Sequence, residues 1–471
     1  MPASGDTIGS RFPAPPSGAG EIEFDWLFLD LNSYFASVEQ QTRPELRGLP
    51  VAVVPVETDY TCAIAASYPA KALGIKTGTM IGEAKRKCPQ LICVLADHKK
   101  YVDYHHRILE ELDRHIPVEK VMSVDEVACR LSGEWRTPAG AIALARRIKA
   151  GIARNVGECL TSSVGISTNR LLAKIASDMQ KPDGLVTLHP RELPQRLSHL
   201  ALHDLPGIGP NMERRLWAAR IETIEQLWAA APKHLRAIWG SVMGERFWYA
   251  FRGQELPEEP TTRRMIGHSH VLAPEHRPAA EAAIVARRLL LKAATRLRHL
   301  GCYATRLDLG ARIDKGPRLG FTAPFQPACD SFALLQALAG LWDKLLKETG
   351  EVRFKKVSVT LHGLVPEDDL RQLNLFNTTG AIASTPPAAT PAEQARRKQR
   401  ERLSEAMEAA NHRHGRDAVT LGVMPGTVKE FTGAKIAFNR VPERRDFDDL
   451  MEHLLAPAPP RPPETEPDEV E

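Results

Sequence analysis

The segment VMSVDEVACRL at residues 121–131 holds two adjacent carboxylates, Asp125 and Glu126, within an otherwise apolar run. A buried carboxylate without a cationic partner is strongly destabilising, so the pair must meet a metal ion, meet basic side chains or face solvent. Neighbours on a regular strand point to opposite faces of a sheet. If both carboxylates serve one site, the chain must therefore bend there, at a hairpin turn or an irregular strand end.

A third carboxylate, Asp30, ends the apolar run FDWLFLDL. Three carboxylates supply enough hard oxygen ligands to hold two Mg²⁺ ions against a triphosphate. Taken alone, a carboxylate at a strand end is more often a helix cap or a surface residue than a metal ligand. With the pair at 125 and 126 added, the sequence favours a metal ligand and these alternatives equally. A metal site requires Asp30 to lie on the strand that adjoins the pair.

Strand-like and helix-like patterns alternate along the first half of the chain. The strand-like runs are 24–31, 50–56, 60–67, 91–96, 120–131 and 161–167, and the helical ones are 33–41, 70–76, 101–115 and 141–155. This alternation predicts an α/β or α+β first half with the three carboxylates in one sheet. After KPDGLVTLHP the chain becomes helical. A last module combines helices at 280–299 and 331–349 with strands at 304–313 and 355–364.

The last module is also basic. From Arg263 to His362 the sequence has seventeen Lys and Arg against eight Asp and Glu, a local net charge of +9, whereas the whole chain carries only +4. Such a domain is typical of a protein that binds a polyanion, and a solvated basic surface is the alternative.

The cysteines and the chain's beginning favour a soluble intracellular protein. Seven cysteines are scattered without CxxC spacing, which suits a reducing compartment and argues against a zinc ribbon. No run of about 18 apolar residues occurs, and the first residues lack a hydrophobic signal core. Composition predicts disorder in the first 22 or so residues, in 377–394 and in the acidic, proline-rich end.

Four motifs together resemble one family. FLDLNSYFASVEQQTRPELRGLPVAVV, AASYPAKALGIKTG, SVDE and TSSVGISTNRLLAKIASDMQKPDG follow in the order and approximate spacing of the Y-family DNA polymerases. The sequence resembles the DinB-type, DNA polymerase IV group from about residue 24 to 376. The resemblance implies a template-directed DNA polymerase (EC 2.7.7.7) of low fidelity that acts in translesion synthesis and DNA repair. No stretch is left over for a proofreading exonuclease.

The implied fold is α+β and multidomain: a palm with a mixed or antiparallel sheet and helices, small fingers, a helical thumb with a helix-hairpin-helix-like segment, and an α+β little finger. The expected boundaries are 24–33 and 98–187 for the palm, 34–97 for the fingers, 188–255 for the thumb and 262–370 for the little finger. The remaining parts are a disordered N-terminus (1–23), a clamp-binding peptide (371–377), a linker (378–398), a small C-terminal segment (399–450) and a disordered acidic, proline-rich tail (451–471).

The resemblance also implies the catalytic residues. Asp30 and Asp125 match the two metal-bridging aspartates, and Glu126 matches the glutamate that helps hold the metal at the primer 3′ hydroxyl. The backbone carbonyl of Leu31 completes the metal ligands. Two Mg²⁺ ions per active site are implied, with Mn²⁺ as a substitute, for attack of the primer 3′ hydroxyl on the α-phosphate of a nucleoside triphosphate.

Five residues match the family's nucleotide-binding positions: the steric gate Phe35, its neighbour Tyr34, and Tyr68, Lys71 and Lys181 around the triphosphate. Without the family, the aromatic pair would be assigned to the core and the other three to a solvated surface.

Three positions depart from the family pattern. Asn32 stands where a second acid is common, Lys71 where arginine is commoner, and Ala65 where a hydroxyl residue often helps bind phosphate. Lysine replaces a planar bidentate fork with a point charge. The last two departures bear on the strength of triphosphate binding, not on the reaction.

Two further segments imply partners. LPGIGPNMERRL resembles a helix-hairpin-helix, in which Gly207 and Gly209 would let backbone N–H groups approach a DNA phosphate; a tight interhelical turn is the alternative. RQLNLFN resembles the peptide by which bacterial polymerases bind the sliding clamp. Its anchors would be Gln372, Leu373, Leu375 and Phe376.

The expected partners are primer–template DNA, deoxynucleoside triphosphates and the β sliding clamp, for a monomer that binds no membrane and lies in the bacterial cytoplasm at the nucleoid. The segment RRKQRERLSEAMEAANHRHG is interpreted as a basic helix. It has no assigned role beyond an accessory contact with DNA or protein. Two rival functions remain: a noncatalytic polymerase-like DNA-binding scaffold of the ImuB type, and another palm nucleotidyltransferase. The three carboxylates disfavour the first, and the basic module disfavours the second.

Overall fold

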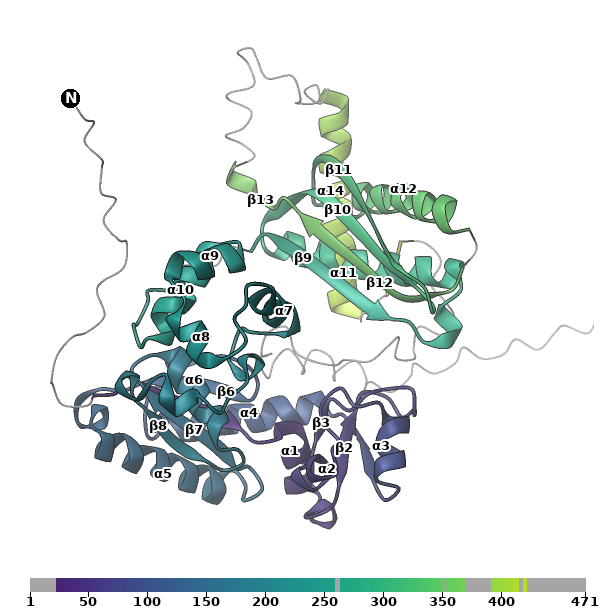
Figure 1. The fold of residues 1–471 in the computed structure, drawn as a ribbon. Coiled ribbons are helices and arrows are strands. Elements are labelled where there is room, and N and C mark those ends of the chain that lie inside the picture. Colours follow the sequence, from purple (N-terminus) through teal and green to yellow (C-terminus); the bar gives the residue numbers. More distant parts are fainter. Residues whose placement is uncertain (1–22, 259–262, 351, 370–390, 415–417, 422–471) are drawn as a thin grey trace, which may run out of the picture. The chain divides into compact units, whose positions relative to one another are not determined.

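The computed structural model describes residues 23–258, 263–350, 352–369, 391–414 and 418–421 (Figure 1). These residues form two compact units, one on each side of the gap at 259–262. Within the described ranges, no helix is both long enough and apolar enough to cross a membrane.

The main sheet of the first unit is built around β1 (Trp26–Leu31), all of whose residues are buried. β1 pairs antiparallel with β6 (Glu126–Arg130) on one side and with β7 (Ser162–Ser167) on the other. The strand order is β5-β6-β1-β7-β8, with β5 (Lys120–Val121) and β8 (Leu185–Leu188) at the edges. A strand covered on both faces is almost entirely apolar, and WLFLDL departs from this pattern only at Asp30.

Alternation along β1 divides its side chains between two faces of this sheet. The three leucines pack into a core that includes residues of α4 (His98–Asp113) and α5 (Pro138–Asn155). The two aromatic residues instead share a cluster with Ala173 of α6 (Arg170–Met179). Asp30 belongs to the second series, so its side chain lies on the α6 face.

Residues 34–97 carry a smaller sheet of order β3-β2-β4 with its own apolar core. Its elements are α1 (Tyr34–Thr42), β2 (Val51–Val54), β3 (Ala65–Ala66), α2 (Tyr68–Ala72), α3 (Ile81–Lys87) and β4 (Ile92–Leu95). The strand predicted over 60–67 is wrong for most of that range. Only its end pairs with β2, and Cys62 makes just an isolated bridge to Met80.

Four short helices complete the first unit and share a core with α6. They are α7 (Pro210–Ala218), α8 (Ile224–Ala229), α9 (Pro232–Trp239) and α10 (Val242–Phe251). Proline opens α7 and α9, where its fixed φ suits the first helical position and its missing N–H leaves no bond unmade.

The second unit is a sheet of order β11-β10-β12-β9 covered by two long helices (Figure 1). Its elements are β9 (Met265–Val271), α11 (Ala279–His299), β10 (Cys302–Ile313), β11 (Arg318–Ala328), α12 (Ser331–Thr349), β12 (Phe354–His362) and β13 (Val365–Pro366). The predicted helices and the strands at 304–313 and 355–364 are confirmed. β11 was not predicted because it contains Gly320, Pro324 and Pro327. An edge strand tolerates proline, since one side of it makes no ladder bonds.

A further helix, α14 (Pro391–His414), confirms the basic helix predicted in this region. It begins at Pro391, inside the predicted linker 378–398, and the linker's C-terminal boundary stays a prediction. The sequence PAEQARRK is rich in strong helix formers and opens with proline, which favours a helix start there. The predicted clamp-binding peptide lies outside the described residues.

Candidate active site

Asp30 and Glu126 stand directly opposite each other in the β1–β6 ladder. Residues at one rung of an antiparallel pair share a face of the sheet, so both side chains lie on the α6 side. Asp30 is 6% exposed, and Glu126 is half-buried. Two of the three predicted carboxylates are therefore neighbours although they are far apart in the sequence.

Asp125 reaches the same region because the chain turns just before β6. The N–H groups of Met122 and Ser123 donate to the Glu126 carbonyl over 2.9 and 3.2 Å, which closes the turn after β5. Leu31 N–H donates to the Asp125 carbonyl over 2.9 Å. Ser123 Oγ donates to Asp125 Oδ1 over 2.5 Å. The bend that the adjacent carboxylates required is present as a hairpin beside β1, as predicted.

Two lysines contact this carboxylate cluster. Lys174 Nζ lies 2.5 Å from Asp30 Oδ2 and 2.8 Å from Glu126 Oε1. It also lies 3.1 Å from Asp178 Oδ1. Lys181 Nζ lies 2.7 Å from both Asp30 Oδ1 and Asp178 Oδ1. Each oxygen of Asp30 therefore has its own ammonium partner.

Lys174 and Asp178 were not predicted from the sequence, whereas Lys181 was. Lys174 and Asp178 lie four positions apart on α6, a spacing that places them next to one another on one helix face, and Lys181 follows two residues after the end of the helix. This charged stripe, in KIASDMQK, was the signal that could have identified them.

The carboxylates of the cluster keep Lys174 protonated. Burial raises the pKa of Asp125 and of Glu126, and the nearby charge of Asp30 adds to both shifts. Burial by itself lowers the pKa of Lys174, but the charges of Asp30 and Asp178 raise it above its ordinary value. Lys174 is thus a protonated counter-ion for a carboxylate cluster that would otherwise repel itself.

The donor set fits a hard divalent cation, because carboxylate and carbonyl oxygens are the ligands that Mg²⁺ prefers. Across the described ranges, no group of three or more His, Cys, Asp or Glu side chains is arranged to hold a metal ion. Both oxygens of Asp30 are held by lysine. A metal ion would have to replace those ammonium contacts.

The predicted triphosphate residues lie beside the carboxylates. Lys71 Nζ is 4.6 Å from the centroid of the Tyr68 ring. Burial, then the charge of Lys181, lowers the pKa of Lys71, while Asp30 opposes the shift. Burial raises the pKa of Tyr68, and Lys181 acts against that shift. Lys71 thus lies over the Tyr68 ring and Lys181 contacts Asp30, and the charges of Lys181 and Asp30 act on both Tyr68 and Lys71.

Phe35 is held in place by a stack on Tyr101, with ring centroids 4.2 Å apart and planes at 13°. The Tyr101 ring is fully buried, and its hydroxyl donates to Glu39 Oε1 over 2.9 Å. Tyr34 is 3% exposed, and its hydroxyl donates to the Tyr101 carbonyl over 2.6 Å. The Tyr34 side chain therefore lies in the core and supports Tyr101, and contact of this residue with the nucleotide stays a prediction.

The predicted DNA-binding glycines lie at the start of α7. Gly207 has a φ of +91°, which favours glycine, and Gly209 is the residue before the first helical position. A side chain added at either position would meet no atom within 4 Å. The space next to both glycines is open.

Protonation of His105 is expected to destabilise the first unit. Its Nδ1 lies 2.8 Å from the carbonyl of Val124, next to Asp125, and its side chain is 1% exposed. Burial lowers the pKa of His105 from 6.5 to about 4. Between these values only the unfolded chain takes up the proton, so stability present at neutral pH falls as the pH drops through this window, by roughly 3 kcal/mol.

Urea unfolding of the chain and of His105→Gln, followed by tryptophan fluorescence at about pH 7 and about pH 4.5, measures this effect. The variant should start less stable because it loses a fitted hydrogen bond, yet lose less stability on acidification. Equal losses in the two proteins would contradict this role for His105.

Three family models match the chain in sequence order. Residues 29–178 match the impB/mucB/samB family, residues 203–255 match "DNA polymerase-iota, thumb domain", and residues 263–375 match the impB/mucB/samB family C-terminal domain. Together they cover the carboxylate site, the helices after it and the module built on β9 to β13.

Curated relatives extend the match. A protein of Moorella thermoacetica named DNA polymerase IV is 34% identical over 357 residues, which are 74% of this chain and 88% of that protein. The chain belongs to the Y-family DNA polymerases of the DinB type. A DNA polymerase IV of Halorhodospira halophila is 30% identical over 74% of this polymerase and 98% of its own length.

A solved Y-family DNA polymerase chimera shares the polymerase's fold. It is 23% identical in sequence, with a TM-score of 0.61, and the match covers 73% of this chain and 99% of that one. The multidomain α+β fold expected from the sequence is thereby confirmed. Helix α14 lies beyond residue 375, where the last family model ends.

Proposed function

We propose that the polymerase extends a primer 3′ end at the site formed by Asp30, Asp125 and Glu126, copying a template with low fidelity. As a DinB-type member of its family, the chain is a DNA-directed DNA polymerase that acts in translesion synthesis. The convergence of three carboxylates from two strand ends, beside Lys71 and Lys181, supports this location. Primer extension by the purified chain tests the proposal, and no extension with any divalent cation would contradict it.

Asp30, Asp125, Glu126 and the Leu31 carbonyl would hold two Mg²⁺ ions, with Mn²⁺ as a substitute. Bound there, the ions supply Lewis acidity at the 3′ hydroxyl and at the triphosphate. The hairpin before β6 brings Asp125 and Glu126 together, which supports this role, and the Leu31–Asp125 backbone hydrogen bond holds the hairpin against β1.

The remaining site residues bind and select the nucleotide. Lys71, Lys181 and the Tyr68 hydroxyl would contact the triphosphate, because two cations and a phenol suit phosphate oxygens. Phe35 would lie under the sugar and exclude a ribose 2′ hydroxyl. Its stack on Tyr101 supports that role, because a ring that excludes the 2′ hydroxyl by steric clash must be held in place.

Lys174 is proposed to be a resident counter-ion that stabilises the site when no metal is bound. Lys174→Met should lower the melting temperature in EDTA, because breaking a buried pair leaves charges uncompensated. A divalent cation should then raise the melting temperature more in the variant than in the unaltered chain. Thermal unfolding with and without Mg²⁺ or Mn²⁺ measures both effects without any need for activity.

Lys149→Met is the matched control for this experiment. Lys149 is also 18% exposed, but its partners are Asp183 and the Gly184 carbonyl and none of the carboxylates of the cluster. This control should lose stability with no larger metal response. A metal response of Lys174→Met no greater than that of Lys149→Met would remove Lys174 from its proposed role.

We assign the palm to 24–33 and 98–187, the fingers to 34–97, the thumb to 188–255 and the little finger to 262–370. The open backbone at Gly207 and Gly209 supports contact of the thumb with a DNA phosphate. The net positive charge of the last of these domains suits the template backbone. We further propose a monomer in the bacterial cytoplasm that acts at the nucleoid.

Gln372, Leu373, Leu375 and Phe376 are proposed to bind the sliding clamp. Deletion of 372–376 should leave basal primer extension unchanged and abolish its stimulation by the clamp, because a short apolar anchor adds affinity only by tethering. Primer extension with and without loaded clamp measures this. Stimulation that survives the deletion would show that another segment is the tether.

A further inference from the structure

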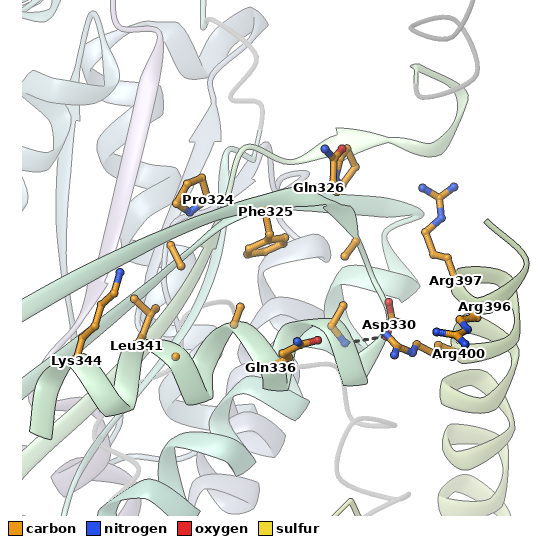
Figure 2. A pocket seen from close by; sticks show the side chains of 16 residues that line it. Pro324, Phe325, Gln326, Asp330, Gln336, Leu341, Lys344, Arg396, Arg397 and Arg400 are labelled. Atoms are coloured by element: carbon orange, nitrogen blue, oxygen red, sulfur yellow. Dashed lines mark hydrogen bonds between the residues drawn. The ribbon is translucent and has the colours of Figure 1, made fainter. Parts of the chain in front are cut away.

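A pocket of about 570 Å³ lies between β11, α12 and α14 in the second unit (Figure 2). Phe325 of β11 and Leu341 of α12 contribute apolar surface to it. Four cationic side chains line it as well: Lys344 from α12, and Arg396, Arg397 and Arg400 from α14. An apolar surface with this concentration of positive charge is unlike an ordinary solvated helix face.

The arginines are held over the pocket because α14 is docked by specific polar contacts. The N–H of Ser331, at the start of α12, donates to Ser404 Oγ over 3.1 Å, and Ser404 is 2% exposed. Arg298 Nε of α11 donates to Glu408 Oε1 over 2.9 Å. These contacts fix the helix at two places one helical turn apart and present Arg396 and Arg400 as part of a built surface.

The carboxylates that line the pocket do not neutralise its positive charge. Asp330 is the one carboxylate that lines it, and its Oδ1 accepts hydrogen bonds from the N–H groups of Phe332 and Ala333 at the start of α12. Arg397 pairs with Glu401 over 3.5 Å. Within the part of the chain that the structure describes, Arg396, Arg400 and Lys344 form no ion pair.

We propose that this pocket binds an unpaired segment of nucleic acid. Guanidinium groups suit phosphate oxygens, and an aromatic ring beside them suits a stacked base, the combination by which proteins hold single strands without reading sequence. The volume admits one or two nucleotides and excludes a duplex. The pocket shares no residue with the carboxylate site of the first unit, and the binding measured below requires no polymerisation.

The test uses the full chain with its polymerase site filled by excess unlabelled hairpin primer–template. Binding of a labelled oligothymidylate of about ten nucleotides is followed by fluorescence anisotropy at several salt concentrations. Arg396→Gln with Arg400→Gln should weaken binding roughly tenfold. The slope of log affinity against log salt should also become shallower by about 1.4, because two phosphate contacts are lost.

Lys398→Gln with Arg402→Gln is the matched control, since both residues are exposed on α14 but do not line the pocket. It removes the same charge and should change affinity less than about twofold. Equal losses in the two variants, or no loss in either, would overturn the proposal.

Photo-crosslinking gives a second readout on the unaltered chain. A thiothymidine oligonucleotide should crosslink to the peptide that contains Phe325. Crosslinks found only in other peptides would overturn the proposal. So would binding of polyglutamate that depends on Arg396 and Arg400 and is not displaced by oligothymidylate, because the ligand would then be an acidic peptide. Primer extension scored in parallel tests the polymerase site independently.

Discussion

Replacing Asp125 and Glu126 together with alanine is expected to lower primer extension at least about a thousandfold, equivalent to about 4 kcal/mol of transition-state stabilisation. The double change removes two of the three carboxylates at the strand ends. Asp30 would remain, with both of its oxygens held by Lys174 and Lys181. Single-turnover extension with Mg²⁺ and all four deoxynucleotides measures the loss.

The control for this variant removes two carboxylates elsewhere in the first unit. Asp59 and Glu83 are exposed and form surface ion pairs with Lys85 and Lys87. Asp59→Ala with Glu83→Ala should extend primers at close to the unaltered rate, because surface pairs contribute little. If the Asp125 and Glu126 variant extended primers as well as this control, the assigned catalytic centre would be wrong.

Phe35→Ala is expected to raise ribonucleotide incorporation about a hundredfold relative to deoxynucleotide incorporation, a change of about 2.7 kcal/mol in discrimination. The proposed gate relies on the stack of the Phe35 ring on Tyr101, whose own hydroxyl donates a hydrogen bond to Glu39. The ratio of kcat/KM for matched ribo- and deoxynucleotides measures discrimination.

Tyr101→Leu provides a graded test of the same idea. It leaves Phe35 in place but removes its stacking partner, so discrimination should weaken by less than in Phe35→Ala. Unchanged sugar discrimination in Phe35→Ala would remove that residue from the gate. Discrimination lost in Phe35→Ala but retained in Tyr101→Leu would show that the stack does not support it.

The carboxylate site was predictable because its sequence signals are unusual for their surroundings. Adjacent carboxylates in an apolar run required a bend, and the structure places them at a hairpin next to Asp30. Lys174 was not predicted, because a lysine on an amphipathic helix is normally assigned to the surface. Its role depends on β1, which is distant in sequence, and a local pattern carries no information about such a partner.

Two other differences have local causes. Tyr34 and Phe35 are adjacent aromatic residues, and nothing in their sequence distinguishes the buried ring from the one beside the site. The difference arises from the start of α1, where successive side chains point in different directions. The β11 strand was missed because proline and glycine normally interrupt strands, and only its position at a sheet edge makes them tolerable.

The central position of β1 has a consequence for synthesis of the protein. Among the strands that the structure describes, WLFLDL leaves the ribosome first, yet both of its hydrogen-bonding partners, β6 and β7, are made much later. Until they emerge, an apolar strand with two free edges is available to any other chain. Nascent molecules should therefore depend on chaperones that shield extended apolar segments, and premature termination before Glu126 should yield fragments prone to aggregation.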